Sequence, residues 1–445
     1  MHHTFPHNNR FICNFNLVPI SLDMKKLLSI FLVLITTTVS AQCDTTLRPV
    51  VFIHGFLASG DTWSNAAQYF RQAGYCADRL YAFDWNSIAG SGKKTEQQLA
   101  QFIDKILSTT GARQIDLVGH SAGGGLARNY LKDSLQSTKV SHYVHVGSRS
   151  WTGNYTWFPN NRCLTIFSSG DKVAGNSAGP TEGASNLALT DEDHYQVATG
   201  ATSLKTMLQF FYPEKRALID PPIEKKVSIA GKAVLLGDNR ALSGATINIY
   251  LLRKSNGTRK MTGAIKGFSV NNAGDWGPVT VKPGSPYEIE LVPPDSNKRK
   301  ISYFFSSFTH SDPLVYLRGI PEGTRMMAML GTLPEKDDQS LLVLYAATGA
   351  MIGGRDSVTI NGTPVCSPTL MPAAKTVISS FIYDDGDQIS SAQPLKQFNS
   401  LPFIGGVDLL LPAGKNKLIE IYWNGKTLKI PASPSKERIL LAVFR

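Results

Sequence analysis

Residues 117–125 read LVGHSAGGG and place four glycines, a histidine and a serine directly after an apolar run. Glycine is a poor helix former, because it loses more backbone freedom on folding than any other residue. Such a cluster indicates either a loose turn or a place where the backbone packs too closely for side chains. The segments on either side decide between these two interpretations.

Strands and helices are predicted to alternate from residue 48 to residue 211. The unbroken apolar run RPVVFIHG (48–55) is typical of a parallel strand that is buried on both faces. TWSNAAQYFRQAG (62–74) and TEQQLAQFIDKILSTTG (95–111) have helical spacing and end in glycine. The alternation predicts an α/β fold with a parallel sheet, so residues 117–125 would join a buried strand to a helix.

The second half of the chain has a different pattern. Residues 216–226 contain a diproline and several charges, which is typical of a linker. Residues 227–445 consist of short alternating strands separated by turn residues, which predicts an all-β region. Residues 42–215 and 227–445 are therefore the two predicted domains, in keeping with a length of 445 residues.

The amino-terminal segment resembles an export signal. Residues 24–41 (MKKLLSIFLVLITTTVSA) have a basic start, a short apolar core and small residues at the end, as in a secretory signal peptide that starts at Met24. The apolar run is shorter than the ~20 residues of a membrane-spanning helix. The sequence therefore predicts a secreted protein, extracellular or periplasmic, with residues 1–23 as an upstream extension.

Four cysteines follow the predicted signal peptide, namely Cys43, Cys76, Cys163 and Cys366. Disulfides form in exported proteins, and of the three possible connectivities we favour one with a Cys43–Cys76 bond. No Cys/His spacing indicates a structural zinc site. The run Asp384-Asp385-Gly386-Asp387 lacks the alternate-residue pattern of calcium loops, so a tight turn is the favoured interpretation. We predict no cofactor and no metal in catalysis.

Composition excludes several classes of protein. The chain is 42% hydrophobic and 18% charged, as folded soluble proteins are. Its net charge of +11 comes mostly from residues 214–445. Basic and aromatic residues are not interleaved as in an RNA-binding sheet, so no nucleic-acid partner is predicted.

Residues 119–123 fit the pattern G-x-S-x-G, in which a serine occupies a strained turn between a strand and a helix. The glycines two positions away let the strand and the helix approach, while the hydroxyl of Ser121 is lifted clear of the sheet edge. The start of the following helix also favours negative charge that forms beside Ser121. The pattern predicts Ser121 as a nucleophile.

A serine nucleophile requires a base, and the base requires an acid that orients it. His142 and His145 fall within a predicted strand and are interpreted as packed or surface side chains. His194 lies in a polar loop ahead of the last helix, where its imidazole can reach the sheet edge. We predict His194 as the base.

The predicted acid is Asp171, which ends the strand CLTIFSSGD and precedes the base in the chain. Asp84 ends an earlier strand and would break that order. Three further carboxylates are alternatives but are too close in sequence to His194 to curl back onto it easily: Asp191, Glu192 and Asp193.

An oxyanion that forms during acyl transfer needs two backbone N–H donors. Ala122, directly after the nucleophile, is predicted to supply one. The loop FIHGF after the first strand would supply the other from Phe56, because Gly55 lets the backbone approach closely. His54 is predicted to fix this loop by hydrogen bonds.

The blocks VVFIHGF, LVGHSAGGG, SSGDKVAG and DHYQVATG resemble, in this order, the lipase/esterase branch of the α/β-hydrolases over residues 48–213. The resemblance implies carboxylic ester substrates and the triad Ser121, Asp171 and His194. The aromatic segment WTGNYTWFP (151–159) fits a small lid or acyl wall and fits a packed surface loop equally well. Its candidate substrate-binding residues are Trp151, Tyr155, Trp157 and Phe158.

Residues 227–293 resemble the prealbumin-like sandwich modules of secreted enzymes. The later blocks SYFFSSFTHSDPLVYLR (302–318) and FIYDDGDQISSAQPLKQFNSLPFIGGVDLLLPA (381–413) resemble the C-terminal β-barrel of archaeal-type secreted lipases. In that group the barrel helps bind lipid and covers the active site. The resemblance implies an enzyme that acts on long-chain acyl esters.

The main hypothesis is a secreted serine carboxylic ester hydrolase, above all a lipase, that forms an acyl-enzyme on Ser121. Its partner would be an acyl ester or lipid, or a lipid or polymer surface. The alternatives are a polyester depolymerase or acyltransferase with the same triad, and a surface-binding protein with a vestigial hydrolase domain. The sequence does not indicate an oligomeric state.

Overall fold

The computed structural model describes most of the chain, namely residues 43–153, 157–214, 220–295, 297–320 and 323–445. The predicted upstream extension and signal peptide lie outside the described residues, and so does Tyr155. Within the described part, no helix combines the length and the apolar character needed to cross a membrane.

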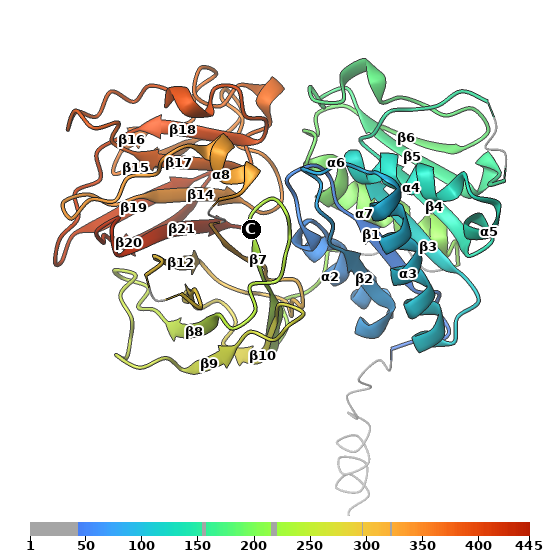
Figure 1. Ribbon diagram of the computed structural model, residues 1–445, viewed down its shortest axis with the longest axis horizontal. Helices are drawn as coiled ribbons and strands as arrows, with labels where there is room; N and C mark the ends of the chain where they lie inside the picture. Colours follow the sequence, from blue (N-terminus) through green and yellow to red (C-terminus); the bar gives the residue numbers. More distant parts are fainter. Residues whose placement is uncertain (1–42, 154–156, 215–219, 296, 321–322) are drawn as a thin grey trace, which may run out of the picture. The chain divides into compact units, whose positions relative to one another are not determined.

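The α/β region, residues 43–214, is built on a six-stranded sheet of order β2-β1-β3-β4-β5-β6 (Figure 1). All neighbouring strands in it are parallel. Its strands are β1 (Val50–Ile53), β2 (Leu80–Phe83), β3 (Ile115–His120), β4 (Val140–Val146), β5 (Cys163–Ser168) and β6 (Ser185–Leu189). Every residue of β1 and β3 is buried, as expected for parallel strands covered on both faces.

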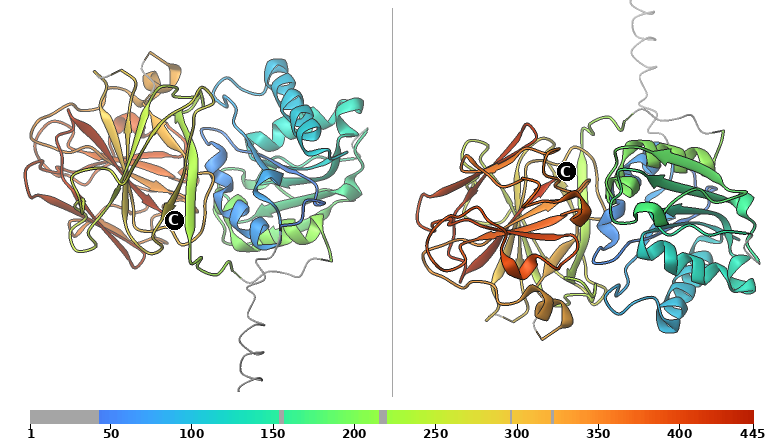
Figure 2. Two further views of the ribbon diagram at one scale, coloured as in Figure 1. Left: turned by 90° about the horizontal axis from the view of Figure 1, so that it is seen from below. Right: turned by 90° about the horizontal axis from the view of Figure 1, so that it is seen from above.

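Helices cover both faces of this sheet (Figure 2). They are α2 (Ser64–Gln72), α3 (Lys93–Thr110), α4 (Ala122–Leu131), α5 (Ser134–Ser137), α6 (Gln196–Thr199) and α7 (Ala201–Phe211). Apolar residues of α2 and α7 pack into one core, and those of α3 and α4 pack into another. On α3, Leu99, Ile103 and Ile106 recur at helical spacing and form the buried face.

The predicted α/β fold class is confirmed by this arrangement. Strand β6 was not predicted, because its sequence SNLAL is short and lies largely exposed at the sheet edge. Cys43 and Cys76 form a disulfide, which is the bond favoured from the sequence. Cys163 and Cys366 are free thiols.

The β region, residues 220–445, contains three sheets, of orders β10-β7-β13, β18-β17-β14-β21-β12-β11-β8-β9 and β16-β15-β19-β20. Its strands are β7 (Val227–Leu235), β8 (Thr246–Leu251), β9 (Lys266–Ser269), β10 (Asp275–Val281), β11 (Tyr287–Val292), β12 (Lys300–Phe305), β13 (Leu317–Gly319), β14 (Leu342–Ala346), β15 (Val358–Ile360), β16 (Thr363–Pro364), β17 (Ser379–Tyr383), β18 (Ile404–Asp408), β19 (Leu418–Trp423), β20 (Lys426–Pro431) and β21 (Arg438–Phe444). One short helix, α8 (Arg325–Leu330), also belongs to it.

The eight-stranded sheet is buried on both faces. One hydrophobic core joins it to the sheet of β7, β10 and β13, and a second joins it to that of β15, β19 and β20. In β21, Ile439 and Val443 enter the first core, whereas Leu440 and Phe444 enter the second. The predicted all-β class of this region is confirmed. The predicted boundaries at residues 215 and 227 fall between α7 and β7 and remain predictions.

Candidate active site

Ser121 lies in a sharp turn between β3 and α4. Its backbone angles are φ 54° and ψ −122°, a positive φ that a residue with a side chain rarely adopts. Such strain persists only where the surrounding structure enforces it, and it concentrates at functional sites. The turn presents the hydroxyl of Ser121 at the carboxyl ends of the central strands.

The glycines around Ser121 are required by close approach of the backbone. A Cβ at Gly123 would lie 2.5 Å from the carbonyl oxygen of His54 and 2.6 Å from that of Ile53, at the end of β1. A Cβ at Gly119 would lie 2.7 Å from the carbonyl oxygen of Gly123. The cluster is therefore no loose turn, because α4 begins directly against the neighbouring strand.

The three residues predicted as a triad lie within hydrogen-bond distance of one another. His194 Nε2 is 2.9 Å from Ser121 Oγ, and His194 Nδ1 is 2.7 Å from Asp171 Oδ2. His194 and Asp171 are buried, with 2% and 1% of their surfaces exposed. With Nδ1–H donating to the carboxylate, Nε2 carries the lone pair that accepts the serine proton.

The environment of Asp171 keeps it ionised. Burial alone would raise the pKa of its carboxyl, but the hydrogen bond and charge of His194 outweigh burial and lower it. Asp171 Oδ1 also accepts hydrogen bonds from the backbone N–H groups of Val173 and Ala174, both at 2.9 Å. These contacts orient Oδ2 toward the imidazole.

The alternative acids have other partners. Asp84 accepts hydrogen bonds from Lys232 Nζ and Tyr316 Oη of the β region, both at 2.8 Å. Asp193 binds Arg355 at 2.9 Å, and Asp191 is exposed. Among the described residues, only Asp171 pairs its carboxylate with the imidazole of His194.

The two predicted oxyanion donors belong to segments that adjoin Ser121. Ala122 is the first residue of α4, and Phe56 follows Gly55, where a Cβ would be 3.1 Å from Ser121 Cβ. Neither backbone N–H has an acceptor within the part of the chain that the structure describes. His54 accepts from the Trp85 N–H at 3.2 Å, as its predicted structural role requires.

The structure adds a histidine that sequence reasoning did not assign. His120 is the last residue of β3, and its Nε2–H donates to the carbonyl oxygen of His194 at 2.8 Å. Burial lowers the pKa of His120 to about 3, so the ring is neutral at ordinary pH. The residue before the nucleophile thus holds the backbone of the residue that would serve as base.

The β region also contacts the segment that carries His194. Arg355 Nη1 donates to Asp193 Oδ2 at 2.9 Å and to Gln196 Oε1 at 3.0 Å. Thr199 Oγ1 donates to the carbonyl of Thr348 at 2.6 Å. We call these contacts the β-region clasp. No sequence pattern indicated them, because the residues are distant along the chain.

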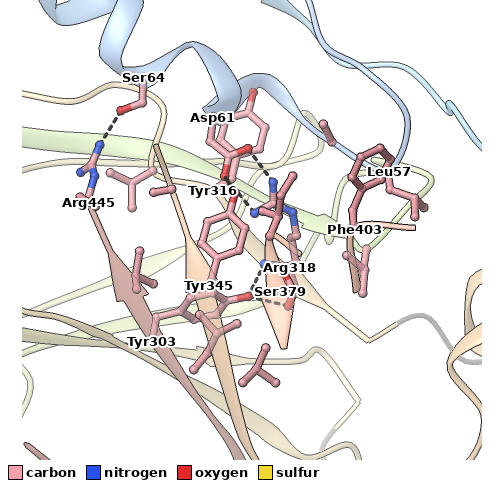
Figure 3. A pocket seen from close by; sticks show the side chains of 18 of the residues that line it. Leu57, Asp61, Ser64, Tyr303, Tyr316, Arg318, Tyr345, Ser379, Phe403 and Arg445 are labelled. Carbon is pink, nitrogen blue, oxygen red and sulfur yellow. Dashed lines mark hydrogen bonds and ion pairs between the residues drawn. The ribbon is translucent and has the colours of Figure 1, made fainter. Parts of the chain in front are cut away.

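A cavity of about 120 Å³ lies beside the loop that follows β1 (Figure 3). Its wall includes Phe56 and also Phe403, whose ring stacks on His194 with centroids 5.9 Å apart. An ion pair between Asp61 and Arg318, at 2.5 Å, forms a polar part of the lining. Most of the wall is apolar and comes from inward-facing β-region residues, for example Ile301, Phe305, Val343, Phe381 and Leu441.

The aromatic segment predicted as a lid or acyl wall lies elsewhere. Trp151 and Phe158 are buried in the core that α3 and α4 form with the sheet, whereas Trp157 is 59% exposed. None of these three described residues lines the cavity. A role for this segment in binding substrate remains a prediction.

Comparisons with known families agree with this architecture. Residues 47–148 match the family model of class 2 lipases, and residues 225–320 match that of a lipase C-terminal domain. Residues 344–444 match a model of a further C-terminal domain. A triacylglycerol lipase of Vibrio cholerae serotype O1 is 31% identical over 111 residues, which cover 23% of this chain and 34% of that protein. The chain thus spans about a third of the length of this curated relative.

Two solved structures are similar to part of this chain. Lipase BlEst2 of Bacillus licheniformis, in mature form, is 17% identical with a TM-score of 0.31 and covers 38% of this chain and 94% of its own. Esterase RhEst1 of Rhodococcus sp. is 15% identical with a TM-score of 0.30 and covers 39% and 94%. The chain is thus similar to class 2 lipases over residues 47–148 and to a lipase C-terminal domain over residues 225–320, which lie in the α/β region and the β region described above.

Proposed function

We propose that the protein is a serine carboxylic ester hydrolase, a lipase that acts on acyl esters through an acyl-enzyme on Ser121. The observation that supports this proposal is the hydrogen-bonded series Ser121–His194–Asp171 on a strained turn, with two free backbone N–H groups beside it. A serine hydroxyl reacts with an ester only when a base takes its proton.

The mechanism follows from the positions of these groups. His194 Nε2 takes the proton of Ser121 as Oγ attacks the ester carbonyl, and the N–H groups of Phe56 and Ala122 stabilise the oxyanion. The imidazolium then protonates the leaving alcohol as the ester C–O bond breaks, which leaves an acyl group on Oγ. His194 next takes a proton from water, whose oxygen attacks the acyl carbon. The imidazolium then gives this proton to Ser121 Oγ as the acyl C–Oγ bond breaks, which releases the carboxylic acid and restores the serine hydroxyl.

The cavity supports an acyl ester with a hydrocarbon chain as substrate. Its wall is shared between Phe56, which would donate to the oxyanion, and apolar side chains of the β region. A hydrocarbon chain leaving the reacting carbonyl gains about 0.8 kcal/mol for each methylene that it buries there. We therefore expect kcat/KM to rise with acyl length until the cavity is filled.

Replacing the nucleophile tests the chemistry. Ser121→Ala should lower p-nitrophenyl ester hydrolysis by at least ~10⁴-fold while the circular dichroism spectrum stays unchanged. A fluorophosphonate should label Ser121, as read by peptide mass spectrometry. The control is Ser169→Ala, whose hydroxyl donates to the Thr190 carbonyl and which should keep both activity and label. Turnover retained by the Ser121 variant would disprove the assignment.

We also propose that the protein is secreted after cleavage following Ala41. The Cys43–Cys76 disulfide supports this proposal, because such bonds persist in oxidising compartments. Mass spectrometry of protein recovered outside the cytoplasm should find Gln42 as the first residue. An intact leader on folded, active protein in the cytoplasm would contradict it.

A further inference from the structure

Three carboxylates meet at one edge of the eight-stranded sheet. Strands β17 and β18 are parallel, and Tyr383 lies opposite Asp408 in their register. Asp384 and Asp385 follow the end of β17, and Asp408 ends β18. Since parallel strands end at the same edge, residues distant in sequence are brought together there.

The three side chains form a compact set of oxygen atoms. One carboxylate oxygen each from Asp384, Asp385 and Asp408 lies within 4.8 Å of the others. Asp384 is 2% exposed and Asp408 is 3% exposed, whereas Asp385 faces solvent. In the described ranges, no Lys, Arg or His forms an ion pair with any of the three. Two buried carboxyl groups thus lie together without a cation, although burying a charge is costly unless it is paired.

The hydrogen bonds leave one of these oxygens unused. Asp408 Oδ1 accepts from the Asp385 N–H at 3.1 Å, and its Oδ2 accepts from the N–H and hydroxyl of Ser391. Asp384 Oδ2 accepts from the Gly386 N–H at 3.1 Å. Asp384 Oδ1 is buried and has no hydrogen-bond partner among the described residues. An unpartnered buried carboxylate oxygen beside two other carboxylates is suited to a metal ion.

We propose that Asp384, Asp385 and Asp408 bind a divalent cation of the calcium type. The donors are all oxygens, which hard cations prefer, and the set includes none of the Cys or His ligands that favour zinc. Ca²⁺ takes six to eight oxygen ligands in a flexible geometry, so water on the side of Asp385 can complete its coordination.

This site is compatible with the chain direction changing near residues 384–387, where a tight turn was predicted. The structure has a bend at residues 386–388, Asp384 Oδ2 accepts from the Gly386 N–H, and Gly386 has a φ of 118°. What the run lacks as a calcium loop is a third ligand at suitable spacing, and Asp408 supplies it from the next strand. Bound calcium would tie the edge strand β18 to β17 and so stabilise the β region.

The test is calcium binding by the full-length protein after it has been stripped of metal with a chelator. Isothermal titration with Ca²⁺ should show one site with a Kd of about 1 mM or tighter, and saturation should raise the melting temperature by roughly 3 °C. Asp384→Asn and Asp408→Asn should each weaken binding at least tenfold. Mg²⁺ should bind more weakly than Ca²⁺, because it demands a stricter octahedral geometry.

Two variants at the turn keep the test decisive if the buried substitutions prevent folding. Asp385→Asn changes an exposed side chain and should still weaken calcium binding at least threefold. Asp387→Asn removes the same charge two positions further along the chain, outside the cluster, and should bind calcium as the wild type does. Absence of a calcium heat and of a melting shift at 10-fold the expected Kd would overturn the proposal. An equal loss of calcium affinity in the Asp385 and Asp387 variants would also overturn the proposal.

Discussion

Ser121 and His194, the proposed nucleophile and the proposed base, are held in different ways. Ser121 is fixed by its own neighbours, because glycines 119 and 123 let backbone pack directly on backbone. His194 is fixed from outside its loop, by His120 from β3 and by the clasp and Phe403 from the β region. One half of the site is therefore encoded in nine consecutive residues, and the other half depends on the two regions being packed together.

Among changes that leave the proposed catalytic side chains in place, breaking the turn at Ser121 should have the largest effect. In Gly123→Ala, the new methyl group would lie 2.5 Å from a backbone carbonyl oxygen, which has no freedom to move away. We expect a loss of at least about 3 kcal/mol in the free energy of unfolding and at least ~100-fold in activity. Urea unfolding and p-nitrophenyl ester hydrolysis measure the two losses.

Gly124→Ala is the matched comparison within the same run. Its methyl group would meet the side chain of Ser148 at 2.7 Å, and that side chain has some room to shift. The loss should be smaller than for Gly123→Ala. A larger loss at Gly124 than at Gly123 would mean that backbone contact does not set the requirement for glycine.

The contrast between the two halves also explains what the sequence could predict. The turn, the strand before it and the helix after it have local signatures, so Ser121 and its context followed from the pattern alone. His194 and Asp171 followed from chain order and from their places at element ends. Arg355 and Phe403 had no such signature, because their roles arise only where the β region meets the α/β region.

Strand β21 had no local signature either, for a physical reason of the same kind. β21 is apolar on both faces, since it separates two cores, and therefore lacks the alternation that marks a half-buried strand. Its parallel pairing with β12 and β14 also brings together segments far apart in the chain. Likewise Asp408 reaches Asp384 only through the register of β17 and β18.

A second prediction concerns the β-region clasp. Arg355→Ala would leave the buried carboxylate of Asp193 without its cation, next to His194, the proposed base. Because Arg355 is one-third exposed, water would partly replace it, and we expect about 2 kcal/mol of lost stability. As His194 loses its fixed position, kcat should fall by ~10-fold with KM little changed.

Two further variants separate positioning from a general loss of stability. Arg355→Lys keeps a cation for Asp193 and should recover most of kcat. Asp193→Asn combined with Arg355→Ala removes the unpaired charge while an amide oxygen can still accept from the Tyr195 N–H. The double variant should recover stability more fully than kcat. If kcat and KM changed across these variants only in proportion to the free energy of unfolding, Arg355 would have no positioning role.

A third prediction concerns two buried histidines. One of them, His120, lies beside Ser121 and donates to the carbonyl of His194. Burial lowers the pKa of His120 to about 3 and that of His145 to about 4, below the value near 6.5 of an unfolded chain. Between these values the unfolded state binds more protons, so stability must fall as the pH drops below 6.5. Each histidine should contribute about 1.4 kcal/mol per pH unit within its window.

Unfolding in urea at pH 7.5, 6 and 5 measures this slope. His145→Gln should reduce this slope by the contribution of one histidine. It should leave ester hydrolysis near that of the wild type, since the His145 ring bonds the Tyr143 hydroxyl and the Arg149 carbonyl and none of the three proposed catalytic residues. His120→Asn should reduce the slope similarly and also lower kcat, because the carbonyl of His194 loses its donor. An unchanged slope in both variants would refute the assignment of neutral buried rings.

The smallest effect should come from Gly125, the last of the three consecutive glycines at residues 123–125. At Gly125, within α4, an added Cβ would meet no atom within 4 Å, and its φ is not positive. Gly125→Ala should therefore raise the free energy of unfolding by about 0.5–1 kcal/mol, because alanine loses less backbone freedom on folding. Ester hydrolysis should not change. A destabilised or less active Gly125→Ala would contradict this explanation. The close contacts of Gly123 and Gly124 with their neighbours would then not account for the requirement for glycine at residues 123–125.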